Sequence, residues 1–363
     1  MNFEKLGTDL RETLSLTRNR QAIRRSLQSQ SPPLTLLDSN IRDYKTDGLD
    51  CLIVLVRHIY SEVLDVYYSG EENKTAEEKN PILALAWLDI DPEDKKAWAD
   101  CKRHVLEVLN PAEGGTIQTC FASLVNSPLM NETFWSQDIH ILFRACLEKS
   151  LEANSRWRHA DLGPNPRAAM VELSTIVADR NAKPDWTFRQ FVRSPFKILK
   201  KHDKQQLNMC AAPAIIRVHL KTNKDVEPFP FSTLKNFQID IAGVNGSEPI
   251  VKDMLCGYTL IASVSLKEQR IRTYRPLGEE IVRGTGYLGR RWSLENREDG
   301  EFMLFYRRSD DAVADSYTPE TVTIPKEMPT LAIVNNALQE DIDRRRAQRA
   351  AEREEDERAQ MEH

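Results

Sequence analysis

The chain has 363 residues, 40% of them hydrophobic and 29% charged, with a formal net charge of −5. This apolar content supports a folded core and excludes a wholly disordered chain. Charges of both signs are interspersed, so electrostatics give no case for nucleic acid or for a membrane surface as a partner.

The six cysteines, at positions 51, 101, 120, 146, 210 and 256, form no C-x-x-C pair. Their spacing excludes a ribbon of two such pairs around zinc, and we expect no metal and no cofactor. Few cysteines in so long a chain are typical of a reduced intracellular protein. The start, Met-Asn-Phe-Glu-Lys, lacks the apolar core of a secretory signal, and the apolar run 51–56 is too short to span a bilayer. The sequence therefore predicts a cytoplasmic or nuclear protein.

Residues 1–33 read as an N-terminal helix followed by a linker that ends at Pro32-Pro33. The next helix is predicted to begin at Cys51, with Asp50 as its N-cap, and to run toward Tyr68. A cysteine at a helix N-terminus lies near the positive end of the helix dipole, which favours the thiolate. The alternative is a small buried cysteine at the start of a core helix.

Residues 71–80 read as an exposed charged loop, and 81–88 and 92–109 read as helices. A second cysteine segment follows, Thr119-Cys-Phe-Ala-Ser123, whose Cys120 suits either core packing or chemistry. Helical segments are also expected at 133–152 and 167–180.

Short runs rich in Val, Ile, Leu, Phe and Tyr then occupy most of residues 213–310, separated by Pro, Gly, Asn and Asp. These runs are 213–221, 258–266, 270–274, 292–296 and 302–310, and four of the five read as strands. In the first, Ile216, Val218 and Leu220 alternate with polar residues, which is typical of a strand with one buried face. We expect an antiparallel sheet packed against the helical front half, an α+β fold.

The order of these runs resembles the C-terminal half of the ubiquitin-specific peptidases, a family of papain-like cysteine proteases. The matching pieces are Pro213–Lys221, Phe231–Asp240, Tyr258–Val264, Trp292–Asn296 and Phe302–Arg307. The resemblance covers about the last third of the chain and implies a papain-like fold. It implies one domain over 34–311, with a helical lobe at about 34–205 and a sheet lobe at about 206–311.

The same resemblance assigns roles to residues. Cys51 takes the nucleophile position, and Cys120, whose local sequence is also similar to the family's cysteine motif, is the alternative. Asn296 takes the position of the third triad member. Aligning Tyr274 with the last tyrosine of the family's histidine strand puts Arg270 at the position of the catalytic histidine and Gln269 at that of the glycine before it. No histidine lies between His219 and His363. Arginine cannot act as a general base near neutral pH.

The resemblance therefore implies a distant, degenerate family member without peptidase activity. It would act by binding ubiquitin or another protein. Two alternatives stay open: an active thiol-dependent deubiquitinating hydrolase, and an unrelated α+β interaction protein. Residues 312–363 read as a proline-containing linker and a highly charged helix, either a solvated tail or an arm that binds another protein.

Overall fold

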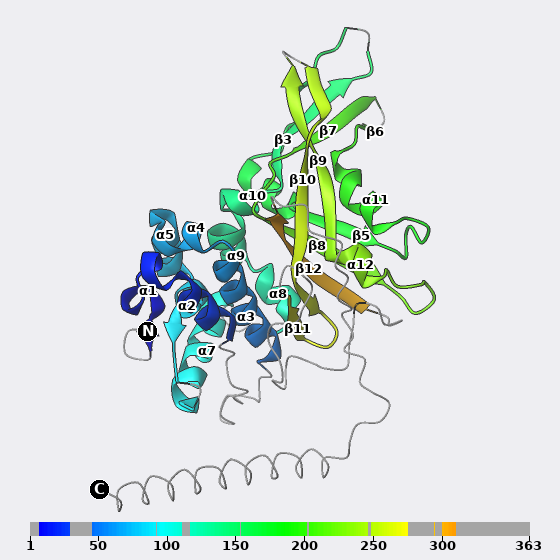
Figure 1. Cartoon of the computed structure of the whole chain (residues 1–363). Coiled ribbons are helices and arrows are strands. Elements are labelled where there is room, and N and C mark those ends of the chain that lie inside the picture. Colours follow the sequence, from blue (N-terminus) through cyan, green and yellow to red (C-terminus); the bar gives the residue numbers. More distant parts are fainter. Residues whose placement is uncertain are drawn as a thin grey trace, which may run out of the picture. The chain divides into compact units, whose positions relative to one another are not determined.

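The computed structural model describes residues 7–29, 46–91, 93–110, 117–152, 154–201, 203–245, 248–274, 294 and 300–309. Helices dominate before residue 140 and strands after it, which confirms the α+β fold class (Figure 1). The predicted N-terminal linker and the charged C-terminal helix lie outside the described residues.

The front of the chain is a cluster of short and medium helices around one central helix. Its helices are α1 (Leu10–Thr13), α2 (Leu16–Ser29), α3 (Asp47–Glu62), α4 (Leu64–Ser69), α5 (Glu71–Lys79), α6 (Pro81–Leu85), α7 (Lys95–Leu109), α8 (Phe121–Val125) and α9 (Pro128–Met130). A π-helical turn, η2 (Asn131–Trp135), and a 3-10 turn, η3 (Asp138–His140), complete this part. Strands β1 (Thr8–Asp9) and β2 (Leu88–Asp89) pair with each other. The segment 71–80, predicted as a loop, is the helix α5.

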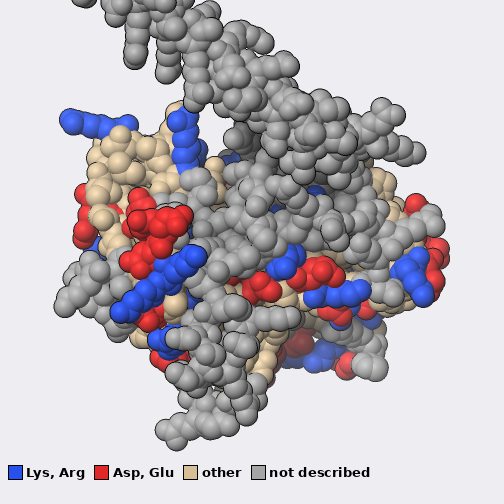
Figure 2. All heavy atoms as spheres, turned by 90° about the horizontal axis from the view of Figure 1, so that it is seen from below, with Lys and Arg blue, Asp and Glu red and all other residues tan. Residues whose placement is uncertain are grey.

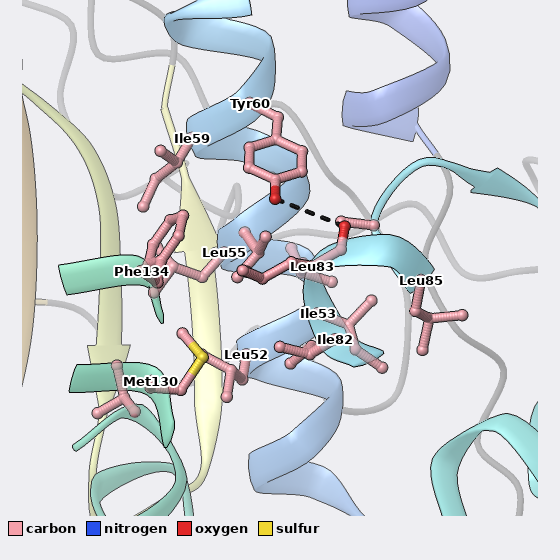
Figure 3. Packing of buried hydrophobic residues seen from close by; sticks show 14 of the residues in the cluster. Leu52, Ile53, Leu55, Ile59, Tyr60, Ile82, Leu83, Leu85, Met130 and Phe134 are labelled. Atoms are coloured by element: carbon pink, nitrogen blue, oxygen red, sulfur yellow. Dashed lines mark hydrogen bonds between the residues drawn. The ribbon is translucent and has the colours of Figure 1, made fainter. Parts of the chain in front are cut away.

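Helix α3 is the centre of the helical part. Every residue from Gly48 to Ser61 is buried, as expected for a helix that is covered on all sides. Figure 3 shows its apolar side chains packed against α6 and against Met130 and Phe134, with the Tyr60 hydroxyl donating to the Leu83 carbonyl oxygen at 3.5 Å. Arg57 donates to the carbonyl oxygens of Ser26, Leu27 and Leu88, and so ties α2 and β2 to α3.

The main sheet has six strands: β5 (Thr175–Asp179), β8 (Ile215–Thr222), β9 (Asn236–Asn245), β10 (Glu248–Ser265), β11 (Arg270–Thr273) and β12 (Gly300–Ser309). Its order is β11-β10-β12-β8-β5, and β9 pairs with the first part of β10. All pairs are antiparallel except β5 with β8. The strands predicted at 213–221, 258–266, 270–274 and 302–310 are confirmed, whereas the run 292–296 lies outside the described residues apart from Leu294.

Both faces of this sheet are buried where it meets the helices. Along β12, Met303 and Phe305 pack into the core of the helical part, while Leu304 and Tyr306 pack into a second core. The second core lies under α11 (Phe188–Arg193) and α12 (Phe231–Lys235), on the opposite side of the sheet from α1–α9 (Figure 1). The sequence predicted a sheet with one buried face. The structure instead has a sheet with a hydrophobic core on each face.

A separate four-stranded sheet stands within the range expected to be helical. It has the order β4-β3-β7-β6, formed by β3 (Phe143–Ser150), β4 (Arg158–His159), β6 (Leu199–Lys201) and β7 (Lys204–Cys210). The helix predicted at 133–152 thus gives way to a strand at Phe143, and the helix predicted at 167–180 is α10 (Pro166–Leu173) followed by β5. In both places the pairing with a distant strand overrides local helical spacing.

Candidate functional site

Three segments that are distant in the sequence meet at the start of α3. The first is the opening turn of α3, the second is the segment Thr119–Phe121 before α8, and the third is the turn that leads into β11. A Cβ atom placed at Gly48 would lie 2.2 Å from the Thr119 carbonyl oxygen and 2.4 Å from the Phe121 amide nitrogen. Only glycine lets these backbones approach so closely.

Gln269 holds the three segments together from the β11 side. Its side-chain oxygen Oε1 accepts a hydrogen bond from the Phe121 amide at 2.6 Å, and its main-chain oxygen accepts one from the Cys51 thiol at 3.4 Å. Its φ is 51°, in the left-handed region that favours glycine. The family resemblance aligns a glycine with this position. Sequence reasoning placed no role on Gln269, and only that glycine alignment pointed to its backbone.

Cys51 lies one turn inside α3 and not at the helix start. The helix begins at Asp47 with Thr46 as its N-cap, so the prediction of Asp50 as N-cap was wrong. The Cys51 side chain is fully buried. Burial raises the pKa of its thiol well above the ordinary value, the nearby Asp50 raises it further, and Arg270 opposes them. The raised pKa favours the protonated thiol. The burial agrees with the alternative of a small buried cysteine in a core helix.

Arg270 lies beside this start of α3. Its guanidinium nitrogen Nη1 is 3.2 Å from the Asp47 carboxylate, and both side chains are 26% exposed. The Asp47 carboxylate is thus paired with the Arg270 cation. The predicted third member, Asn296, lies outside the described residues.

Asp50 takes part in a fully buried ion pair behind Cys51. Its carboxylate is 2.8 Å from the Lys102 Nζ of α7, and both side chains are 0% exposed. Thr46 donates to the same carboxylate at 3.1 Å. Burial raises the pKa of Asp50 from 3.8 to about 6, although Lys102 and Thr46 lower it. This pair fixes the first turn of α3 on α7.

Cys120 is the more accessible of the two candidate cysteines. It is the N-cap residue of α8, is partly exposed, and its Sγ donates to the Ser123 hydroxyl at 3.0 Å. It directly precedes Phe121, whose amide binds Gln269. The structure therefore brings both candidate cysteines to the same turn before β11.

Two of the described histidines, His219 and His140, make contacts of their own. His219 of β8 lies in the same row of the sheet as Ile271, the neighbour of Arg270 on β11, three strands away. At the spacing between neighbouring strands, the two residues are about 14 Å apart. His219 binds Glu301 at 2.6 Å. His140 is buried against the Tyr67 hydroxyl at 2.5 Å. The charged groups that act on the Cys51 thiol are Asp50, Arg270 and Asp47, and no histidine is among them.

Neither a metal centre nor a membrane span emerges from the part of the chain that the structure describes. No three His, Cys, Asp or Glu side chains there are grouped so as to hold a metal ion. Nor does that part contain a helix with the length and apolar character needed to cross a bilayer. Among the described residues seen in Figure 2, acidic and basic side chains lie side by side.

Comparison with known proteins found structural similarity without sequence similarity. No protein-family model and no curated protein matches the chain. One similar solved structure is the SAGA Ubp8/Sgf11/Sus1/Sgf73 DUB module bound to ubiquitin aldehyde, with a TM-score of 0.40 and 10% identity over 79% of this chain and 70% of that chain. Another is the apo Pan2 pseudoubiquitin hydrolase–RNA exonuclease module of Saccharomyces cerevisiae, with a TM-score of 0.26 and 8% identity over 88% of this chain and 57% of that chain. Neither similarity assigns a function.

Proposed function

We propose that this chain is a catalytically inactive relative of the ubiquitin-specific peptidases that acts by binding ubiquitin or another protein. The order of the strand motifs suggests the family. The observation that carries the loss of activity is the environment of Cys51. Its thiol is buried and bound to the Gln269 carbonyl oxygen, and its cationic neighbour Arg270 is paired with Asp47.

Within the described residues, the surroundings of Cys51 do not suit thiol catalysis. A cysteine peptidase needs a thiolate and a group that takes a proton and later returns it to the leaving amine. The Cys51 thiol has a raised pKa, and an arginine keeps its proton throughout. The Asp47 carboxylate would repel an oxyanion that formed beside it. Binding of a partner needs none of these groups.

Two measurements test the proposal together. The full chain is incubated with a fluorogenic amide at the ubiquitin C-terminus, and isotope-labelled ubiquitin is titrated with the chain and followed by NMR. We expect no multiple-turnover hydrolysis, saturable shifts of ubiquitin resonances, and the same shifts with Cys51→Ala. Turnover that Cys51→Ala or Cys120→Ala abolishes would establish the hydrolase alternative. Absence of both turnover and resonance shifts would remove ubiquitin as the partner.

The state of the cysteines bears on the cellular compartment of the protein. We place the protein in the cytoplasm or nucleus because all six cysteines are free thiols, which suits a reducing compartment. Subcellular fractionation of cells that express the full chain tests this placement, and recovery in a secreted fraction would contradict it.

The charged segment 331–360 is proposed as a second contact for protein partners. Its deletion should then weaken the binding of such a partner without changing the ubiquitin titration.

A further inference from the structure

A groove lies on the face of the main sheet opposite to Cys51. A hollow of about 690 Å³ opens between the start of α11, the start of α12 and the segment 227–230. Aromatic rings line it, from Trp186, Phe229, Phe237 and Tyr258. Trp186 is half-buried, and the Nζ of the exposed Lys183 lies 3.5 Å from the centre of its ring, so an aromatic ligand takes the place of this ammonium group.

A smaller hollow of about 250 Å³ adjoins the first, and Thr187 and Arg189 line both. On β9, Gln238 lines the larger hollow and Asp240 lines the smaller one. Residues two apart on a strand are separated by about 7 Å. The same distance separates alternate side chains of an extended peptide, so the two hollows match two side chains of one peptide in the extended conformation.

The smaller hollow is cationic. Three of its lining residues are Arg189, Arg193 and Lys197. Arg193 already contacts Asp240 at 3.8 Å and donates to the Gln238 carbonyl oxygen at 3.1 Å. Arg189 and Lys197 are exposed, and within the described part of the chain no carboxylate pairs with either of them. A carboxylate that enters this hollow would gain two cationic partners.

The groove does not suit a nucleic acid. Asp185, Glu227 and Asp240 also line it, and they would repel a phosphodiester chain along its length. A peptide backbone is uncharged, so only its single acidic side chain meets a carboxylate, that of Asp240, which Arg193 contacts at 3.8 Å. An aromatic side chain against Trp186 gives the buried anchor typical of protein interfaces, and the basic residues at the edge give charge complementarity.

We infer that this groove binds an extended peptide of a partner protein, with an aromatic side chain in the larger hollow and an acidic side chain, two positions away, in the smaller one. The inference goes beyond the proposed function. It uses a surface on the other side of the sheet from Cys51, and it holds whether or not ubiquitin is a partner.

The test is fluorescence anisotropy with the full chain and labelled nine-residue peptides of glycine and serine that carry Phe and Glu two positions apart, in both orders. Three control peptides replace Glu by Gln, replace Phe by Ala, or place Phe and Glu next to each other. We expect one order of the first peptide to bind at least tenfold more tightly than all three controls. Higher salt should weaken its binding, because the charged contacts lie near the surface.

Variants of the chain assign the binding to this groove. Arg189→Glu and Lys197→Glu should each weaken binding at least tenfold, and Trp186→Ala should do the same. Lys96→Glu, an equal change of charge on an exposed residue of α7, should leave it unchanged. Equal binding of the Gln peptide, an equal loss with Lys96→Glu, or tighter binding of a labelled single-stranded oligonucleotide would overturn the inference.

Discussion

The ion pair of Asp50 with Lys102 shows how a single residue is kept charged inside the core. Both side chains are fully buried, so each charge has lost its hydration. The pair and the Thr46 hydroxyl together compensate part of that loss, yet the pKa of Asp50 still rises to about 6. Removal of one partner alone leaves the other charge uncompensated.

Lys102→Met should therefore lower the free energy of unfolding by about 3–5 kcal/mol. The pKa of Asp50 is raised from 3.8 to about 6 on folding, so the unfolded chain releases this proton first. The contribution of Asp50 to stability is then present at low pH and is lost as the pH rises through about 6. Loss of Lys102 raises that pKa further, so the effect of the variant should be larger at pH 8 than at pH 5 in urea denaturation.

The double variant Asp50→Asn/Lys102→Met provides the control for this prediction. It removes both charges, and it should recover most of the stability lost in Lys102→Met. A double variant as unstable as Lys102→Met would show that packing of the lysine stem, and not charge, sets the cost.

The two cysteines near Gln269 should differ in reactivity. Cys51 is fully buried with a raised thiol pKa, while Cys120 is partly exposed. Iodoacetamide at pH 8 should modify Cys120 well before Cys51, because only an accessible thiolate reacts. Mass spectrometry of peptides at successive times measures both rates, with Cys101, which is also buried, as internal reference. Equal rates at Cys51 and Cys120 would contradict the closed environment of Cys51.

The residues of the site were predictable to different degrees. Arg270 lies beside the start of α3, and its assignment to the histidine position stays a prediction from the motif order. The burial of Cys51 was one of the two alternatives that its place in an apolar helix left open, and the structure shows it. The role of Gln269 did not follow, because it depends on contacts between distant segments, such as that with Phe121, 148 positions away. No local pattern encodes such contacts.

At the scale of elements, the contact between α3 and the segment before α8 depends on the absence of a side chain. Gly48→Ala places a Cβ atom against two backbone groups, which cannot move aside as a flexible side chain can. We expect a loss of about 1–3 kcal/mol or more in unfolding free energy. Gly300→Ala, where the nearest atom would be 3.6 Å away in the Phe302 ring, is the matched control and should be nearly neutral. Thermal unfolding of both variants makes the comparison.

The elements that the sequence predicted well are those with a long and consistent pattern. The apolar stripe of α7, at Trp98, Cys101, Val105, Leu106 and Leu109, is buried as its helical spacing predicts. Strand β3 was missed, since Phe143, Cys146 and Leu147 also fit one face of a helix. Its pairing with β7, some 60 residues later, decides the outcome, and a single sequence does not show that pairing.

For the whole molecule, one sheet belongs to two cores at once. Alternate residues of β12 enter the core of α1–α9 and the core under α11 and α12. We therefore expect the two cores to unfold together in one transition. Tryptophan fluorescence, dominated by the buried Trp87, Trp98 and Trp135 of the helical side, should report the same urea midpoint as far-UV circular dichroism. Leu55→Ala in one core and Leu304→Ala in the other should shift both signals equally, whereas separate midpoints would show independent lobes.

The central place of β12 has a consequence for synthesis of the chain on the ribosome. β12 lies between β8 and β10, yet it comes after both of them in the sequence. Until residues 300–309 have left the ribosome, β8 and β10 both lack the strand that pairs with them in the middle of the sheet. The apolar side chains on both faces of β8 and β10 are then incompletely covered. Most of the polypeptide must therefore wait in a partly folded form for its last described strand, and it is in this interval that we expect chaperones to bind it.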